Sequence, residues 1–277
     1  MHTSYDLKKP PSRIARWVFW IIYRLRRFLQ IRGRFRVKEV TLYFNPKNPI
    51  EYERYTSLLT KEPGTIDWID NQLKHGDVFI DIGANVGVFG IYAAATKSGV
   101  RVFSFEPQKA TFATLLENIA LNHQIDCHQA TSIALSNHSN LHYLNYSGQV
   151  SGKSGSQIET TSPPKKLSEL VMTQSFDQLL DSGKLPLPNL IKIDVDGLEY
   201  DILKGMKKTL TTSNPKPSLQ VEINPGEEAR IDMLMEEFGY VEQSTHLTPF
   251  GERQHEKGIA LSQIHVNRIY APIDKSS

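Results

Sequence analysis

The segment 77–87 constrains the fold more than any other part of the chain. Residues 78–82 form an apolar run interrupted only by Asp81, which is typical of a buried strand in a parallel sheet. Glycines follow at positions 83 and 87, and apolar residues with helical spacing begin near Phe89. A strand, a glycine turn and a helix in this order predict an α/β protein with a nucleotide pocket at the carboxyl edge of its sheet.

A second apolar run, residues 102–105, ends at Glu106, roughly 20 residues beyond the glycine turn. A carboxylate at this place accepts hydrogen bonds from the hydroxyls of an adenosine ribose. A dinucleotide fingerprint has a middle glycine on which the pyrophosphate lies, and here that position holds Asn85. Asp81 would repel a pyrophosphate but suits a ligand with an ammonium or sulfonium group. The motif therefore favours S-adenosylmethionine over NAD, and a structural turn without ligand is the other interpretation.

These motifs predict a set of cofactor contacts. We expect the cofactor's methionine half to lie on the glycine turn and its ribose on the acidic residue, a set made up of Asp81, Gly83, Ala84, Asn85, Gly87 and Glu106. The adenine is expected at the turn that follows the next predicted strand, residues 125–129, where the chain offers Ser132. That turn has no carboxylate to accept from the exocyclic amine, so the adenine contacts stay open.

Six segments together carry a resemblance to a known family: DVFIDIGANVG, VFSFEPQ, IALSN, SFDQLL, IKIDVDGLEYDILKGM and LQVEINP. In this order they are similar to the FkbM family of S-adenosylmethionine-dependent methyltransferases, over roughly residues 60–272. The first segment is shared by a whole superfamily, but its pairing with IKIDVDGLEYDILKG is much more selective. The resemblance implies a class I methyltransferase fold, which is Rossmann-like, with a mostly parallel seven-stranded sheet and helices on both faces. It also implies O-methylation of a hydroxyl, often on a sugar or polyketide.

Two later predicted strands end in carboxylates. Asp194 stands at the tip of strand 190–195, while Glu222 and Asn224 end strand 218–224. An unpaired buried charge costs several kcal/mol, so carboxylates at strand tips rarely serve the core. We expect Asp194 and Glu222 to be catalytic, one of them accepting the proton of the attacking hydroxyl. Asp194 alternatively holds the methionine ammonium.

A divalent cation is the competing use of the same strand tips. Oxygen ligands from Asp194, Glu222 and Asn224 would suit Mg²⁺, which would lower the pKa of the acceptor hydroxyl. The family resemblance requires no metal, so we favour a general base over an ion.

The N-terminal segment differs from the rest of the chain. Residues 13–36 contain eight arginines and no acidic residue, and apolar side chains recur with helical spacing. The apolar run 17–23 is too short for a bilayer span of about 20 residues, and arginines follow it where a signal peptide has a small-residue cleavage site. Two interpretations stay open: a helix that packs its aromatic face on the domain, and a helix that lies on an anionic membrane surface.

The chain of 277 residues is long enough for one α/β domain of about 200–250 residues with a tail. We divide it into a basic amphipathic helix (1–36), a lead-in segment (37–75) and a methyltransferase domain (76–272). Residues 37–44 alternate like one strand, and Glu62 is expected to be a solvated loop carboxylate. Residues 264–270 should form a closing antiparallel strand at the sheet edge.

Residues 145–168 are rich in Gly, Ser and Pro and predict a flexible loop, either a lid over the substrate or plain disorder. The charge balance of 32 basic against 30 acidic residues gives no nucleic-acid-binding signature. Cys127 is the only cysteine, which fits a reducing compartment. We expect a cytoplasmic protein that meets a membrane, if at all, through residues 13–36 on the cytoplasmic face.

The sequence thus predicts an S-adenosylmethionine-dependent O-methyltransferase. Its acceptor would be a hydroxyl of a glycan, a glycolipid or a small natural product. Two alternatives stay open: a non-catalytic scaffold that binds S-adenosylmethionine, and an NAD-dependent oxidoreductase, which the missing middle glycine disfavours.

Overall fold

The computed structural model describes residues 17–18, 21, 33–145, 151–153, 155, 157–159 and 168–273. A seven-stranded sheet with the order β12-β13-β11-β10-β3-β4-β5 forms its centre. The five strands from β11 to β5 are parallel, namely β11 (Ser218–Ile223), β10 (Leu190–Ile193), β3 (Val78–Ile82), β4 (Arg101–Phe105) and β5 (His128–Thr131). β13 (Val266–Pro272) runs antiparallel to both of its neighbours, β11 and β12 (Tyr240–Leu247). The predicted mostly parallel seven-stranded sheet is confirmed.

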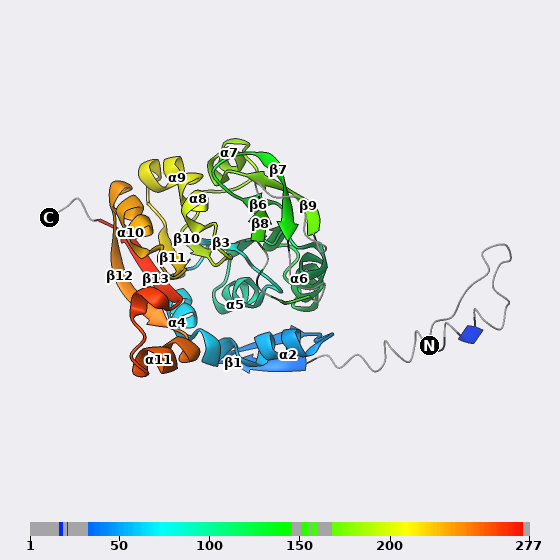
Figure 1. Cartoon of the computed structure of the whole chain (residues 1–277). Helices are drawn as coiled ribbons and strands as arrows, with labels where there is room; N and C mark the ends of the chain where they lie inside the picture. Colours follow the sequence, from blue (N-terminus) through cyan, green and yellow to red (C-terminus); the bar gives the residue numbers. More distant parts are fainter. Residues whose placement is uncertain are drawn as a thin grey trace.

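Helices cover both faces of this sheet (Figure 1). One face packs against α8 (Glu199–Lys204), α9 (Lys207–Thr212) and α10 (Glu228–Glu237), and the other against α4 (Pro63–Gln72), α5 (Val88–Thr96) and α6 (Lys109–Leu121). Side chains alternate along each strand, so Ile80 enters the first core and Phe79 the second. Both cores consist of buried apolar side chains. The polar side chains expected to be functional lie at the ends of the strands.

A polar row crosses the sheet on the face covered by α4 and α5. Gln220, Lys192, Asp81 and Ser104 occupy adjacent register positions on β11, β10, β3 and β4, and each is at most 1% exposed. Central strands of parallel sheets are normally apolar on both faces. This polar row is an exception to that rule. Its β10 member, Lys192, stands two residues before Asp194, close to the end of the strand.

Residues 33–75, which include the lead-in segment, fold as a hairpin and three short helices. These are β1 (Gly33–Val37), β2 (Val40–Phe44), α2 (Pro49–Thr56), α3 (Leu58–Lys61) and α4. Phe44 stacks on Tyr55 of α2 with ring centroids 4.3 Å apart, which fixes the hairpin on the helix. The prediction of one strand over residues 37–44 was wrong, because Lys38 takes a positive φ of 50° and turns the chain back on itself.

The predicted N-terminal helix is shorter than proposed at its C-terminal end. Gly33–Val37 pair with β2, because this buries Val37 and brings Phe35 against Phe44 and Tyr55, so these residues are extended and not helical. Residues 17, 18 and 21 are helical and exposed, and the rest of the segment lies outside the described residues. Within the described part of the chain, no helix is long and apolar enough to cross a membrane.

A second, four-stranded sheet with the order β6-β9-β7-β8 follows β5. Its strands are β6 (Ala134–Leu135), β7 (Asn140–Asn145), β8 (Gln157–Glu159) and β9 (Ser168–Gln174). The segment predicted as a flexible loop, residues 145–168, thus includes a strand, since backbone pairing with β7 extends residues 157–159. Residues 146–150, 154, 156 and 160–167 lie outside the described residues, and with them most of the proposed lid.

Two further differences concern the end of the domain. β13 is inserted between β11 and β12, so the predicted closing strand is not the edge strand; β12 occupies the edge because it pairs with β13 alone. The connection between them contains α11 (Pro249–Glu256) and a short 3₁₀ turn (Leu261–Gln263). This connection brings Thr248 and His265 to the carboxyl edge of the parallel strands.

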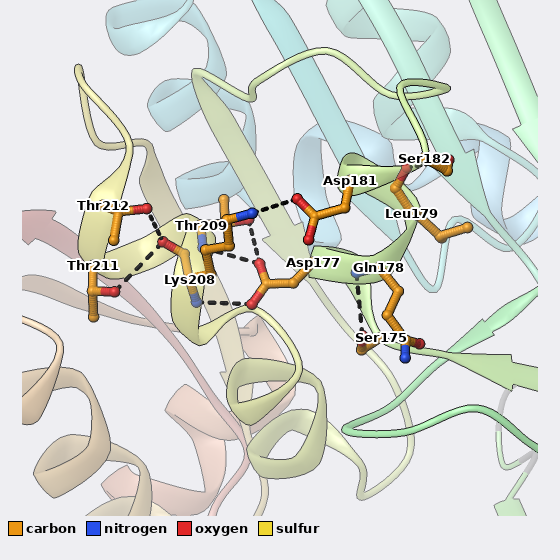
Figure 2. Close-up of polar contacts among 10 residues, drawn as sticks. All are labelled: Ser175, Asp177, Gln178, Leu179, Asp181, Ser182, Lys208, Thr209, Thr211 and Thr212. Carbon is orange, nitrogen blue, oxygen red and sulfur yellow. Dashed lines mark hydrogen bonds and ion pairs between the residues drawn. The ribbon is translucent and has the colours of Figure 1, made fainter.

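One carboxylate joins the helices before and after β10 (Figure 2). Asp177 of α7 (Phe176–Asp181) accepts hydrogen bonds from the backbone N–H of Lys208 and of Thr209, at 2.8 and 2.9 Å, and from the Thr209 hydroxyl at 2.5 Å. These contacts occupy N–H groups in the first turn of α9, which have no partner within the helix. Asp181, one turn further along α7, makes an exposed ion pair with Lys208.

Candidate functional site

A cavity of about 270 Å³ opens at the carboxyl edge of the central strands. Its lining includes the residues that follow β3, β4 and β10, namely Gly83, Asn85, Glu106, Pro107, Asp194 and Asp196. Because β3 lies between β10 and β4, Glu106 and Asp194 flank the glycine turn on opposite sides. The topology has thus brought together residues from three separate predicted motifs.

Gly83 is required by the protein itself. Its φ is +79°, and a Cβ at this position would lie 1.9 Å from the backbone oxygen of Asp194. The missing side chain lets the tips of β3 and β10 approach each other, which aligns the two parts of the site. The sequence predicts that this glycine lets the backbone approach a ligand closely. The structure adds a second reason for glycine, which is the close approach of the neighbouring strand.

Glu106 is held by backbone N–H groups of the glycine turn and of the residues that follow β4. One of its carboxyl oxygens accepts from the N–H of Asn85 and the other from the N–H of Gln108, both at 2.9 Å. Burial raises the pKa of Glu106 to about 7, although both hydrogen bonds oppose this. The carboxylate is thus fixed in the wall of the cavity, where it can accept from a ligand.

Four of the residues predicted to bind a cofactor do not line the cavity: Asp81, Ala84, Gly87 and Ser132. Asp81 is fully buried, accepts from the N–H of Gly90 at 3.2 Å, and has a pKa raised to about 6 by burial. Gly87 packs against Leu115 instead. In place of Ser132, the next residues along, Ile133 to Leu135, form an apolar part of the wall beside Phe105.

Asp194 is the centre of a network of charged groups. The ammonium of Lys192 lies 2.5 Å from its carboxylate, and the carboxyl of Glu222 is hydrogen-bonded to it. Glu62, at the junction of α3 and α4, lines the same cavity. The prediction that Glu62 is a solvated loop carboxylate was wrong, because α3 and α4 fold it against Lys192 and Asp194.

The pKa values of Asp194 and Glu222 are shifted in opposite directions within this network. Burial would raise the pKa of Asp194, but the Lys192 charge outweighs burial and holds that pKa below its usual range. Burial and the adjacent negative charge of Asp194 both raise the pKa of Glu222 far above that of an ordinary carboxyl. The hydrogen bond between the two carboxyls requires a proton, and the Lys192 ammonium beside Asp194 favours its place on Glu222.

The strand-tip carboxylates proposed as Mg²⁺ ligands already have other partners. No group of three or more His, Cys, Asp or Glu side chains among the described residues is arranged to hold a metal ion. Asp194 already has an ammonium and a hydrogen-bonded carboxyl as partners. This donor set does not fit a hard cation, which requires several free oxygen ligands.

Residues far apart in the sequence complete the wall. Arg54 of α2 and Lys61 of α3 add positive charge, and Thr248 and His265 come from the C-terminal part. Lys153 lines the cavity as well, and Arg54 donates to the carbonyl of the adjacent Gly152. No local sequence pattern predicts these contacts, because each depends on the tertiary fold.

A parallel sheet of this strand order, with a glycine turn after the central strand and an acidic residue at the tip of the next, defines the class I methyltransferase fold. The sequence matches the Methyltransferase FkbM domain over residues 81–242, more than half of the chain. The chain belongs to this family.

Two curated relatives illustrate the range of the family. The chain is 32% identical over 171 residues to hexuronic acid methyltransferase AglP of Haloferax volcanii, covering 61% of this chain and 64% of the relative. It is 25% identical over 162 residues to 31-O-demethyl-FK506 methyltransferase FkbM of Streptomyces tacrolimicus, covering 49% and 62%. The matched region is thus less than two thirds of the length of each relative.

Among solved structures, methyltransferase FkbM from Methylobacillus flagellatus KT aligns with 72% of this chain and 44% of its own. Its TM-score is 0.46 and the sequence identity is 13%.

Proposed function

We propose that this protein is an S-adenosylmethionine-dependent O-methyltransferase. The observation that carries the proposal is one cavity lined by both Glu106 and Asp194, on either side of the glycine turn of a chain in the FkbM family. S-adenosylmethionine, when bound, supplies a methyl group on a positively charged sulfur. The protein's own residues then have to bind the adenosyl group, orient the acceptor and accept a proton.

The wall near β4 fits an adenosyl group. Glu106 offers a carboxylate to the ribose hydroxyls, and its two backbone hydrogen bonds keep it in place. Phe105, Ile133 and Leu135 provide an apolar surface for a flat base. Gly83 and Asn85 leave backbone exposed to the cavity, where the methionine part would lie. Four residues predicted to bind the cofactor lie outside the cavity lining: Asp81, Ala84, Gly87 and Ser132. We assign them support of this wall and no direct contact with the cofactor.

Asp194 is the residue we assign to the acceptor hydroxyl. Its side chain is 28% exposed and next to the Lys192 ammonium, so its carboxylate would accept the hydroxyl proton as the methyl group leaves the sulfur for the acceptor oxygen. Glu222 is protonated, and we therefore assign it the positioning of Asp194 by a hydrogen bond and not the first proton transfer. Much of the acceleration would come from alignment, since the sulfonium is already an activated donor.

We propose a sugar hydroxyl as the acceptor, with an acidic sugar favoured. The relative AglP is named for a hexuronic acid, and this chain places Arg54 and Lys61 in the cavity wall, where a carboxylate on the acceptor would be attracted. A glycolipid or a small natural product bearing such a hydroxyl would fit the same chemistry. Of the alternatives, the oxidoreductase is disfavoured by family membership, and the scaffold differs only in lacking turnover.

The test is transfer of a radiolabelled methyl group from S-adenosylmethionine to a panel of acceptors. The panel contains uronic-acid oligosaccharides, their neutral counterparts and a lipid-linked sugar, and Asp194→Asn serves as the matched inactive variant. We expect labelled uronic-acid product with the natural protein and none with the variant. Binding of S-adenosylhomocysteine without transfer to any acceptor would support the scaffold, and transfer to neutral sugars alone would refute the preference for an acidic acceptor.

A further inference from the structure

Lys192 is a buried charged residue in the middle of the central sheet. It follows Ile191 and precedes Ile193 on β10, and its side chain is 1% exposed. It lies next to Asp81 of β3 and Gln220 of β11 in the strand register. It does not line the cavity, so any effect on a bound acceptor has to pass through a neighbour.

The neighbour that it contacts most closely is Asp194. The Nζ atom lies 2.5 Å from the Asp194 carboxylate and 4.7 Å from the centroid of the Phe89 ring on α5. The ring covers the ammonium from the helix side, while the carboxylate lies toward the cavity. Lys192 is therefore confined between an aromatic face and one carboxylate, a geometry that fixes both partners.

The other charged groups around Lys192 come from both neighbouring strands and from the junction of α3 and α4, while α5 contributes the uncharged Phe89. They are Asp81 on β3, Glu62 and Lys61 at the junction of α3 and α4, and Glu222 on β11, which reaches Asp194. Burial lowers the pKa of the Lys192 ammonium, but the charges of Asp194, Glu62 and Asp81 outweigh burial and raise that pKa above its usual range. Lys192 therefore carries a fixed positive charge across the working pH range.

A buried ion pair is a poor way to stabilise a sheet. Desolvation of both charges offsets much of their attraction, and an apolar pair of similar size commonly gives equal or greater stability. A lysine in a strand surrounded by Ile191, Ile193 and Leu190 therefore requires a reason other than core stability.

We propose that Lys192 is a positioning residue that keeps the Asp194 carboxylate ionised and aimed into the cavity. The inference rests on the role that the proposed function gives to Asp194. Lys192 supplies a compensating charge to Asp194, and Glu222 supplies a hydrogen bond. The site is thereby ready to accept a proton before any acceptor binds.

Two variants and one spectroscopic readout test this. Lys192→Met removes the charge and keeps a linear side chain, and Lys192→Arg keeps the charge. The titration of Asp194 is followed by ¹³C NMR with carboxyl-labelled aspartate, assigned with Asp194→Asn. In the natural protein, the Asp194 carboxyl should titrate at a pH below about 3.9, the usual pKa of an aspartic acid side chain. In Lys192→Met its titration, and with it the acid limb of turnover, should move upward by about one to three pH units, while Lys192→Arg stays near the natural protein.

The outcomes separate this inference from the proposed function. Asp194 titrating at an ordinary value in the natural protein would overturn the role of Lys192, even if Lys192→Met does not fold. An unchanged Asp194 titration in a folded Lys192→Met would overturn it as well. If no acceptor is methylated by the natural protein, the proposed function fails, while the NMR titration still decides whether Lys192 holds the charge on Asp194.

Discussion

The backbone oxygen of Asp194 lies 1.9 Å from the point where a Cβ on Gly83 would stand. These two residues directly follow the adjacent strands β3 and β10, and their contact leaves no room for a side chain on Gly83. A side chain at position 83 would therefore push β3 and β10 apart, and the cavity that Glu106 and Asp194 share would change shape.

Gly83→Ala is expected to destabilise the fold by about 3 kcal/mol or more, because the clash adds to the cost of a left-handed backbone. Gly76→Ala is the matched control: its φ is also +79°, but nothing lies within 4 Å of the added Cβ. The control should lose only about 1–2 kcal/mol. Denaturant unfolding measures both, and equal losses in the two variants would show that the contact with Asp194 does not matter.

Asp177→Ala is expected to reduce the free energy of unfolding by about 1–3 kcal/mol. The substitution removes the acceptor of three hydrogen bonds from Lys208 and Thr209 and leaves N–H groups of α9 unpaired. Asp181→Ala, which removes only an exposed ion pair with Lys208, should leave stability unchanged. A comparable loss in both variants would mean that α7 and α9 are not joined through Asp177.

The affinity for S-adenosylhomocysteine should rise with pH through about 7. The ribose hydroxyls donate to an ionised Glu106, and burial raises the pKa of Glu106 to about 7, so protonation at lower pH removes the acceptor. Glu106→Gln should bind more weakly and with a smaller pH dependence.

Glu199→Gln is the control for this pH series. Burial also raises the pKa of Glu199 to about 7, but Glu199 does not line the cavity, so the variant should keep the natural pH dependence. Calorimetry from pH 5.5 to pH 8.5 makes the comparison. A pH dependence lost in Glu199→Gln and kept in Glu106→Gln would contradict the assignment of the ribose to Glu106.

Asp194→Asn should lower kcat by about 100-fold or more, since it removes the group that accepts the hydroxyl proton. Glu222→Gln should retain activity within about tenfold, because the amide still donates a hydrogen bond to Asp194. Both variants should bind S-adenosylhomocysteine. If Glu222→Gln is as inactive as Asp194→Asn, Glu222 is itself the base, and the proton assignment made here is reversed.

The parts of the site that the sequence predicts are those with a local signal. Glu106 and Asp194 each stand at the end of an apolar run, and parallel strands bring such ends to one edge. The place of Gly83 in the turn at this edge is predicted for the same reason. Its contact with Asp194 is not, because the distance between two strand tips is a property of the tertiary fold.

Other features depend on contacts that no local pattern encodes. The role of Lys192 depends on strand register, which places it beside Asp81, and on the helix that carries Phe89. Glu62 and His265 reach the cavity from opposite ends of the chain. The turn at Lys38 was missed because hydrophobic alternation continues through it, and alternation alone does not show where a strand reverses.

We propose that this cavity binds the adenosyl group of S-adenosylmethionine. The most direct test is calorimetric titration of the natural protein with S-adenosylhomocysteine, beside NADH and beside Glu106→Ala. We expect micromolar binding of S-adenosylhomocysteine alone, greatly weakened in the variant with its fold intact. Binding of NADH instead, or no binding of S-adenosylhomocysteine by a folded natural protein, would contradict the account.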